Sequence, residues 1–270
     1  MPSEPEFAYE PSDLYRAFAA SRSLDWGPRP LSAADLACRH GEIAAEKSLE
    51  LLGRTIAVEP RVTAEFLASV PSGCSPYQLS LRVKSPESLA RKFRDAAESN
   101  RQAPIDDLLR YTVLTERPDD LVAAARETAG ALVGKGWSVV YAMHSYTDGS
   151  RYKGIHAYLR TPEVERVEVQ WHSVVSAQVK ELTTRWYEIE RSADSPDSAR
   201  TAARENCVAA SAQLRTPAGL ETLAELGGTR VAVKNYSDSR QAAVPREARI
   251  TAEQRTQPSA VHERDLGVAR

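Results

Sequence analysis

The segment from Arg151 to His172 restricts the fold of this chain more than any other. Apolar and polar residues alternate over 155–160 and again over 167–172. Alternation of this kind indicates two strands, each with an apolar face against a core and a polar face turned outward. Thr161 and Pro162 mark a turn between them. The polar positions of the segment include Tyr152, Lys153, His156, Glu168, Gln170 and His172.

That polar face admits two interpretations. An ordinary solvated sheet face more often carries Lys, Glu and Thr, whereas this one brings two histidines and an aromatic residue into a short span. We therefore interpret it as a candidate functional surface, with the solvated sheet face as the alternative.

Composition excludes several classes of protein. The 270 residues include 35 basic and 37 acidic side chains, and this balance argues against a general nucleic-acid coat while leaving room for a local basic groove. The three cysteines are far apart and odd in number, which predicts neither a disulfide framework nor a cysteine zinc site and favours a reducing compartment. The first residues have no apolar signal region, and no run has the length of a membrane span. We expect a cytoplasmic protein without membrane contact.

The pattern along the chain predicts an α/β (α+β) fold in four regions. The sequence predicts an N-terminal helical region over residues 1–76, with helices over 32–52 and 62–70. Residues 77–191 alternate strands with helices and predict a mixed β-sheet core flanked by helices. C-terminal helices are expected over 192–236, including one over 217–226, with an edge strand at 230–234. The polar stretch 237–270 is expected to be a mostly disordered tail.

A basic strand and helix open the core region. Residues 78–84 alternate like a strand, and Ser85 with Pro86 predicts the start of a helix. Charge runs usually form solvated faces, but a basic strand end followed at once by a basic helix is also suited to holding a polyphosphate. The basic residues concerned are Arg82, Lys84, Arg91, Lys92 and Arg94.

Two further segments contribute to the expected core. Asp106 and Asp107 precede a strand over 111–114; adjacent carboxylates are a weak metal signal, because Asp also caps helices and starts turns. A long helix is predicted over 173–191. Its apolar positions recur at steps of three and four, which predicts a core-facing stripe of Val175, Val179, Leu182, Trp186 and Ile189.

Five motifs occur in a fixed order. They are Arg-Val-Lys-Ser-x-x-Ser-Leu-x-Arg-Lys, an Asp-bearing strand ending Arg-Tyr-Thr, Tyr-Lys-Gly-Ile-His, Val-Glu-Val-Gln, and a helix closing Tyr-Glu-x-x-x-Arg. Over about residues 77–191 the chain resembles the synthetase domain of the RelA/SpoT alarmone synthetases, which have a nucleotidyltransferase fold. The motifs Arg-Tyr-Thr and Gln-x-His-Ser resemble those of the divergent, toxin-like small alarmone synthetases more closely than those of the housekeeping members.

The resemblance implies a role for each motif. It implies that ATP is bound by Arg82, Lys84, Arg91, Lys92 and Arg94. It implies that Mg²⁺ is held, and catalysis carried, by Glu168 and by Asp106 or Asp107. It implies that the acceptor is bound by Tyr152, Lys153, His156 and Gln170, with the tyrosine ring stacked on the acceptor base. The chemistry agrees, since pyrophosphoryl transfer needs neutralised phosphates, an activated hydroxyl and an in-line geometry.

Two departures from the family pattern stand out. The spacing from Asp106 to Arg110 is one residue shorter than in housekeeping members, and Leu108-Leu109 replaces a small residue or Gly. Which aspartate binds metal therefore stays open. His172 stands where the family carries an arginine, which leaves the acceptor and phosphate contacts open.

Three functional hypotheses follow. The first is an ATP-dependent pyrophosphokinase acting on the 3′-hydroxyl of GDP, GTP, an adenine nucleotide or tRNA, with growth inhibition as its role and an antitoxin as its partner. The second is a catalytically degenerate module of the same fold that binds nucleotide or RNA. The third, a hydrolytic metal site of His144, His156 and His172, is disfavoured because these residues lack the i, i+4 spacing of zinc proteases.

Overall fold

The structure is a computed structural model that describes residues 6–27, 30–103, 105–192 and 195–236. They belong to one compact unit, Met1–Arg240. Among the described residues, no helix combines the length and the apolar character needed to cross a membrane. The expectation of a disordered tail over 237–270 falls outside the described residues.

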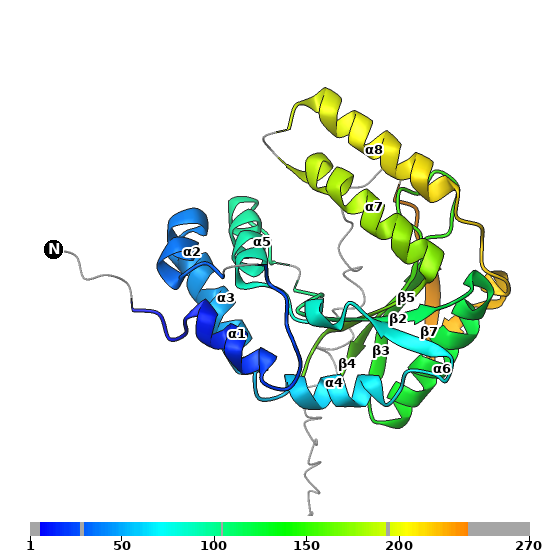
Figure 1. Ribbon diagram of the computed structural model, residues 1–270, viewed down its shortest axis with the longest axis horizontal. Coiled ribbons are helices and arrows are strands. Elements are labelled where there is room, and N and C mark those ends of the chain that lie inside the picture. The colour runs from blue at the N-terminus through cyan, green and yellow to red at the C-terminus, as the bar shows by residue number, and fades with distance from the viewer. Residues whose placement is uncertain (1–5, 28–29, 104, 193–194, 237–270) are drawn as a thin grey trace, which may run out of the picture. The chain divides into compact units, whose positions relative to one another are not determined.

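Four α-helices come first, strands and helices follow in mixed order, and two short strands end the described part of the chain (Figure 1). The helices are α1 (Pro11–Ala19), α2 (Ala33–His40), α3 (Glu42–Thr55), α4 (Glu59–Leu67), α5 (Pro86–Glu98), α6 (Leu121–Gly134), α7 (Val174–Arg191) and α8 (Asp197–Ala212). The strands are β1 (Cys74–Tyr77), β2 (Leu109–Thr115), β3 (Ser138–His144), β4 (Ile155–Arg160), β5 (Val167–Ser173), β6 (Glu225–Leu226) and β7 (Thr229–Val233).

Within the described residues the strands form one mixed sheet in the order β1-β2-β5-β4-β3-β7-β6. The pairs β2–β5 and β3–β7 are parallel, and the other neighbours are antiparallel. The two strands expected over 155–160 and 167–172 are β4 and β5, and they pair with Ala157 opposite Val169. The expected mixed α/β fold is therefore confirmed.

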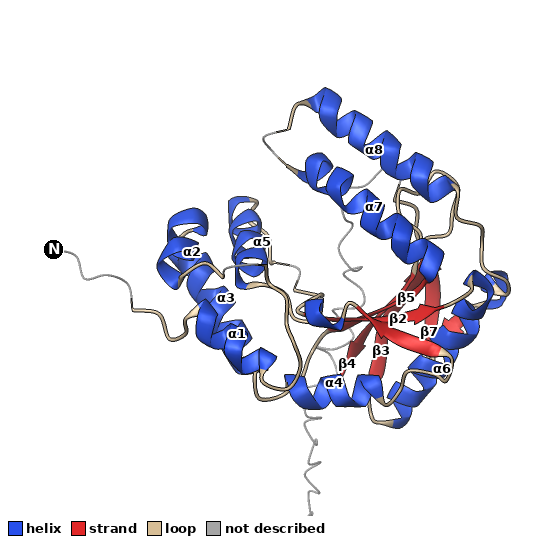
Figure 2. Cartoon of the chain, viewed as in Figure 1, coloured by secondary structure: helices blue, strands red, loops and turns tan. Residues whose placement is uncertain are grey.

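The two faces of the sheet differ in chemistry. On one face, the apolar side chains of β2, β4 and β5 pack with α4 and α6; Tyr111, for example, stacks on Phe66 of α4 with ring centroids 4.6 Å apart. Helix α7, paired with α8, covers the other face, as Figure 2 shows. The alternation in β4 and β5 thus sends Trp171 and Val169 into the core and sends their polar neighbours toward α7.

Helices α2, α3 and α5 pack together beside the sheet. The helix expected over 32–52 is in fact two helices, because the chain turns at Gly41, whose φ of +87° is readily adopted only by glycine. Ser32 caps the first of them by accepting a hydrogen bond from the backbone of Asp35. The second helix continues past the expected end at residue 52 and stops at Thr55.

The strand expected over 78–84 is wrong. Strand β1 ends at Tyr77, Gln78 takes a left-handed conformation with φ +50°, and Leu79–Leu81 form a single 3-10 turn. Only an isolated bridge from Val83 to Leu109 continues the pairing. Arg82 and Lys84 consequently do not share a sheet face.

Two C-terminal expectations are also wrong. The stripe on α7 does not face the core: Val175 and Leu182 are each 48% exposed and Ile189 is 40% exposed. Helix α7 instead packs through small and polar side chains such as Ser176 and Ala177. The helix expected over 217–226 is a 3-10 turn, Leu220–Thr222, followed by β6.

Candidate active site

The polar face of the sheet gathers side chains from three adjacent strands. Backbone register places Arg110 of β2 and Tyr158 of β4 on either side of Glu168 in β5. One step along the strands, Gln170 has Thr112 and His156 as its neighbours. Since side chains two residues apart share a face, these two rows form one polar surface under α7.

Glu168 is the buried centre of this surface. Its Oε1 accepts hydrogen bonds from His156 Nδ1 at 3.0 Å and from Gln170 Nε2 at 2.9 Å. Burial alone would raise the pKa of this carboxyl. The hydrogen bond from His156 and the nearby charge of Arg110 outweigh burial and hold the pKa below its ordinary value. Glu168 is therefore an ionised, oriented carboxylate near neutral pH.

A hydrogen-bonded chain runs from α7 to that carboxylate. The hydroxyl of Tyr152 lies between His156 Nε2 and His172 Nε2, and His172 Nδ1 lies 3.1 Å from the hydroxyl of Ser176. One direction of donation satisfies every member: Ser176 to His172, His172 to Tyr152, Tyr152 to His156, and His156 to Glu168. Burial, reinforced by the charge of Lys180, lowers the pKa of His172 well below its ordinary value, so this ring is neutral.

A second cluster lies where β2 begins. Asp107 accepts a hydrogen bond of 2.6 Å from Lys84 and another of 2.6 Å from Lys92 of α5. Burial acts to raise the pKa of Asp107, but the two ammonium groups reverse the effect and lower it strongly. Glu168 is close enough to this cluster for the charge of Asp107 to act on its pKa. The structure thus brings Lys84, Lys92, Asp107 and Glu168 into one region.

The expected ATP ligand Arg82 is placed elsewhere. Its side chain is fully buried and pairs with Glu59 at 2.6 Å, and its remaining donors reach backbone carbonyls, including that of Phe18. With its donors turned into the core, Arg82 offers nothing to a nucleotide. This correction follows from the turn at Gln78, which removes Arg82 from the expected strand.

The other expected residues divide between the site and its surroundings. Arg94 bonds Asp95 and approaches His40, away from Asp107, and Arg91 is exposed on the same helix. Asp106 pairs with Arg166 at 3.4 Å. Lys153 is buried and donates to the carbonyl oxygen of Leu214, which ties the loop before β4 to the end of α8 rather than to the polar face.

Two cationic side chains at the polar face, Arg110 and Lys180, received no role in the sequence analysis. Arg110 belongs to the quoted Arg-Tyr-Thr motif, and its place two residues before Thr112 put it on the same face. Lys180 is on α7, and its Nζ donates to Gln170 Oε1 at 2.8 Å. Period-two spacing was a usable signal for Arg110. No local pattern distinguishes Lys180 from a solvated helix lysine.

The carboxylates of the site can be compared with the ligands that Mg²⁺ prefers. Among the described residues, no three His, Cys, Asp or Glu side chains group as a metal site. Mg²⁺, however, commonly takes one or two carboxylates and completes its shell with water and substrate phosphates. Asp107 and Glu168, within electrostatic reach of each other, fit such a partial set; for Asp107 to take part, it would have to exchange its lysine contacts.

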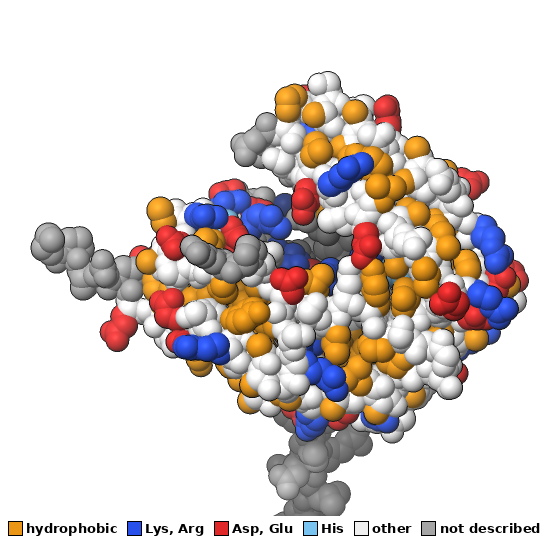
Figure 3. Space-filling model, in the orientation of Figure 1, with side chains coloured by type: hydrophobic (Ala, Val, Ile, Leu, Met, Phe, Trp, Pro, Cys, Tyr) orange, Lys and Arg blue, Asp and Glu red, His pale blue; other side chains and the backbone are white. Residues whose placement is uncertain are grey.

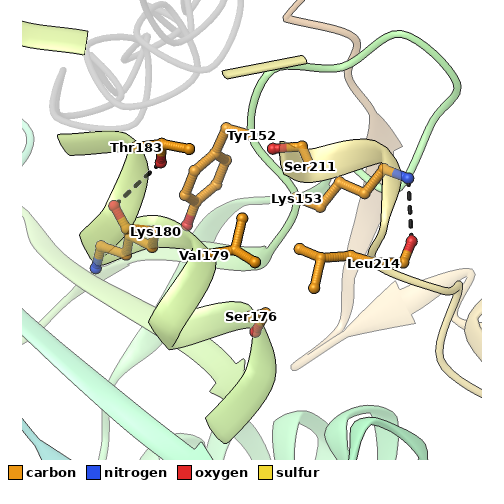
Figure 4. A pocket seen from close by; sticks show the side chains of 8 residues that line it. All are labelled: Tyr152, Lys153, Ser176, Val179, Lys180, Thr183, Ser211 and Leu214. Atoms are coloured by element: carbon orange, nitrogen blue, oxygen red, sulfur yellow. Dashed lines mark hydrogen bonds between the residues drawn. The ribbon is translucent and has the colours of Figure 1, made fainter. Parts of the chain in front are cut away.

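The surface near the site has a hollow and, separately, a narrow crevice. Figure 3 shows a hollow between the surface over α2, α3 and α5 and the surface over α7 and α8, with Lys and Arg side chains at its edge. A separate crevice lies between α7 and α8, where Tyr152 and Lys180 are among the lining residues (Figure 4). That crevice has no room for a nucleotide.

Comparisons with known proteins give structural likenesses at low identity. No protein-family model matches the sequence, and no curated protein matches it. The chain is similar to the type VI effector Tas1, solved in complex with its immunity protein, with 18% identity, a TM-score of 0.40, and coverage of 60% of this chain and 94% of that one.

Two further solved structures are similar. Small alarmone synthetase 2 from Bacillus subtilis has 16% identity, a TM-score of 0.37, and coverage of 60% of this chain and 90% of that one. A GTP pyrophosphokinase family protein from Streptococcus pneumoniae has 12% identity, a TM-score of 0.34, and coverage of 63% of this chain and 83% of that one.

Proposed function

We propose that this chain is an ATP-dependent pyrophosphokinase. It would transfer the β,γ-pyrophosphoryl group of ATP to the 3′-hydroxyl of a guanine or adenine nucleotide, or of the tRNA 3′ end. One observation carries the proposal: an ionised Glu168, oriented by His156 and Gln170, lies on the same face of the sheet as Arg110 and close to the Lys84–Lys92–Asp107 cluster. Pyrophosphoryl transfer needs these two functions, a hydroxyl activator and a phosphate-neutralising cluster, side by side.

In the proposed step, one phosphorus–oxygen bond forms and one breaks. The acceptor 3′-oxygen forms a bond to the β-phosphorus of ATP, and the bond from that phosphorus to the oxygen shared with the α-phosphorus breaks. AMP leaves with the bridging oxygen. Glu168 accepts the hydroxyl proton, and His156 keeps the carboxylate oriented. Lys84 and Lys92 would neutralise the ATP phosphates, releasing Asp107 as they do so.

Magnesium is part of this proposal. Glu168 and Asp107, or Asp106 in its place, would hold the ion. When bound, it would supply positive charge to the phosphate oxygens as bond order changes. Tyr152 would contact the acceptor base through its ring, since its hydroxyl is already engaged by His156 and His172.

A second candidate function rests on Asp107. Its two lysine contacts engage both carboxylate oxygens, as in a structural ion-pair cluster, and Leu108 and Leu109 beside it are buried. A chain that kept these contacts would bind nucleotide or RNA without chemistry. Nucleotide binding without AMP release would identify this alternative.

We also propose that the chain inhibits growth and is neutralised by an antitoxin, because its motifs resemble those of the toxin-like members. Expression of the wild-type chain in a bacterial host should arrest growth, and Glu168→Gln should relieve the arrest at equal protein level. Arrest by both variants would assign the toxicity to something other than the proposed reaction.

The acceptor is identified by one experiment. Purified protein is incubated with magnesium and γ-labelled ATP, with GDP, GTP, AMP, ADP and deacylated tRNA offered in parallel. Label on one acceptor, with release of AMP, supports the proposal and names the substrate. Absence of transfer to every acceptor, from folded protein that binds ATP, would favour the binding module.

A further inference from the structure

Two cationic side chains at the polar face, Arg110 of β2 and Lys180 of α7, form no ion pair with any described residue, although the charge of Glu168 reaches both. The guanidinium of Arg110 makes no hydrogen bond or ion pair with any described residue, although the side chain is half-buried. Lys180 has a neutral partner, the amide oxygen of Gln170, at 2.8 Å. Cations withdrawn from water are normally paired, because desolvation without a partner is costly. These two groups therefore have unused capacity for an anion.

The two cations also act on each other. Burial lowers the pKa of Lys180 to about 8, and the charge of Arg110 is the next cause. Glu168 and Glu181 act in the opposite direction on the same ammonium but do not cancel the effect. Two like charges held near each other in a partly desolvated place are stabilised by a bound anion, which removes their repulsion.

The position of Arg110 and Lys180 indicates which anion they would bind. Arg110 acts on the pKa of Lys84 in the phosphate-neutralising cluster and also on the pKa of Tyr152 in the acceptor region. It lies directly opposite Glu168 in the sheet register. The two cations thus lie beside the proposed hydroxyl activator: Arg110 is opposite Glu168 in the sheet, and Lys180 bonds Gln170, which itself bonds Glu168.

We propose that Arg110 and Lys180 form an anion subsite for the pyrophosphoryl group as it moves from ATP to the acceptor. This inference rests on the proposed function and names the residues that hold the transferred group. The planar fork of Arg110 suits two phosphate oxygens at once, and the ammonium of Lys180 adds a mobile point charge from α7. His172 adds no charge here, because it is neutral and bonded to Tyr152 and Ser176.

The test measures binding of inorganic pyrophosphate by calorimetry, without divalent cation, so that the subsite is separated from any metal. Lys180→Met keeps the length of the side chain and removes its charge, and Arg110→Gln removes the fork. We expect each to weaken pyrophosphate binding about tenfold or more, which corresponds to about 1.4 kcal/mol. Lys180→Arg keeps the charge and should stay within about threefold of wild type.

Matched controls exclude general charge effects. Lys135→Gln and Arg54→Gln remove exposed cations, one after α6 on the opposite face of the sheet and one on α3, and should leave pyrophosphate affinity unchanged. Circular dichroism spectra establish that every variant is folded. If Lys180→Met does not fold, the comparison of Arg110→Gln with Lys180→Arg still decides the result.

The outcomes separate this inference from the proposed function. Equal pyrophosphate affinity in wild type, Arg110→Gln and Lys180→Met, or no binding by wild type, would overturn the subsite even if label transfer from ATP is observed. Pyrophosphate binding that depends on both cations, in a chain that transfers nothing from ATP, would overturn the pyrophosphokinase and leave an anion site on the polar face.

Discussion

Lys180 is the residue whose protonation state gives the most direct prediction. Burial and Arg110 lower its pKa to about 8, from an ordinary value near 10.5. The charged form, which the subsite needs, is therefore present below pH 8 and is lost as the pH rises through that value. Gln170, Glu168, Glu181 and His172 also face or influence this ammonium.

We accordingly expect pyrophosphate affinity of the wild type to fall between about pH 7 and pH 9. Lys180→Arg should flatten this profile, since a guanidinium stays protonated throughout. Calorimetric titrations of both proteins across the pH range make the comparison, and titration of pyrophosphate itself cancels between them. Parallel falls in the two proteins would show that another group is responsible.

At the residue scale, the sequence predicted which polar side chains lie on one face of the β4–β5 pair, and their roles stay predictions. Glu168, Gln170 and His156 were predictable because strict alternation fixes which side chains share a sheet face. The burial of Arg82 was not predictable, because it depends on an ion pair with Glu59. That residue is 23 positions away and reaches Arg82 only in the folded chain. Lys180 was missed because helix periodicity does not reveal what a helix packs against.

At the scale of elements, the ion pair of Arg82 with Glu59 joins α4 to the segment before α5. Both side chains are essentially inaccessible to solvent, and Thr63 also bonds the carboxylate of Glu59. Glu59→Gln would leave a buried guanidinium uncompensated. We expect the free energy of unfolding to fall by about 3–5 kcal/mol.

Urea denaturation of Glu59→Gln tests this, with Glu50→Gln on the exposed side of α3 as the control. The control should change stability by less than about 0.5 kcal/mol. Equal midpoints for the two variants would contradict a structural role for Arg82 and return it to the list of candidate phosphate ligands.

Helix α7 provides a second prediction among the elements. Leu182 was expected in the core, but the structure leaves it half exposed. Leu182→Gln should therefore change the free energy of unfolding by less than about 0.5 kcal/mol. Leu159→Ala, at a fully buried position of β4, should cost about 2–5 kcal/mol. A loss at Leu182 as large as that at Leu159 would show that the stripe on α7 is buried after all.

For the long, periodic segments, the sequence predicted that an element is present and whether it is a helix or a strand. It did not predict where each element ends or what it packs against. The strands expected over 111–114, 155–160 and 167–172 and the helix expected over 173–191 are all present, with small shifts at their ends. The stripe on α7 was misassigned because the polar face beneath α7 favours polar and small side chains, such as Lys180 and Ser176. The break at Gly41 depends on one backbone angle, which hydrophobic spacing cannot indicate.

At the scale of the whole unit, the proposed chemistry depends on three separate parts of the chain. Helix α5 supplies Lys92, the sheet supplies Arg110 and Glu168, and α7 supplies Lys180. None of these parts holds a complete site alone. We therefore expect transfer of pyrophosphate to require the carboxylate of Glu168, whereas ATP binding also depends on Lys84 and Lys92.

The most direct test compares Glu168→Gln with Glu165→Gln, a control in the same β4–β5 hairpin with a side chain that is 85% exposed. Both are assayed for label transfer from γ-labelled ATP and for ATP affinity. We expect Glu168→Gln to reduce transfer at least about 100-fold while it still binds ATP, and Glu165→Gln to match wild type. Wild-type rates of transfer in Glu168→Gln would contradict the account.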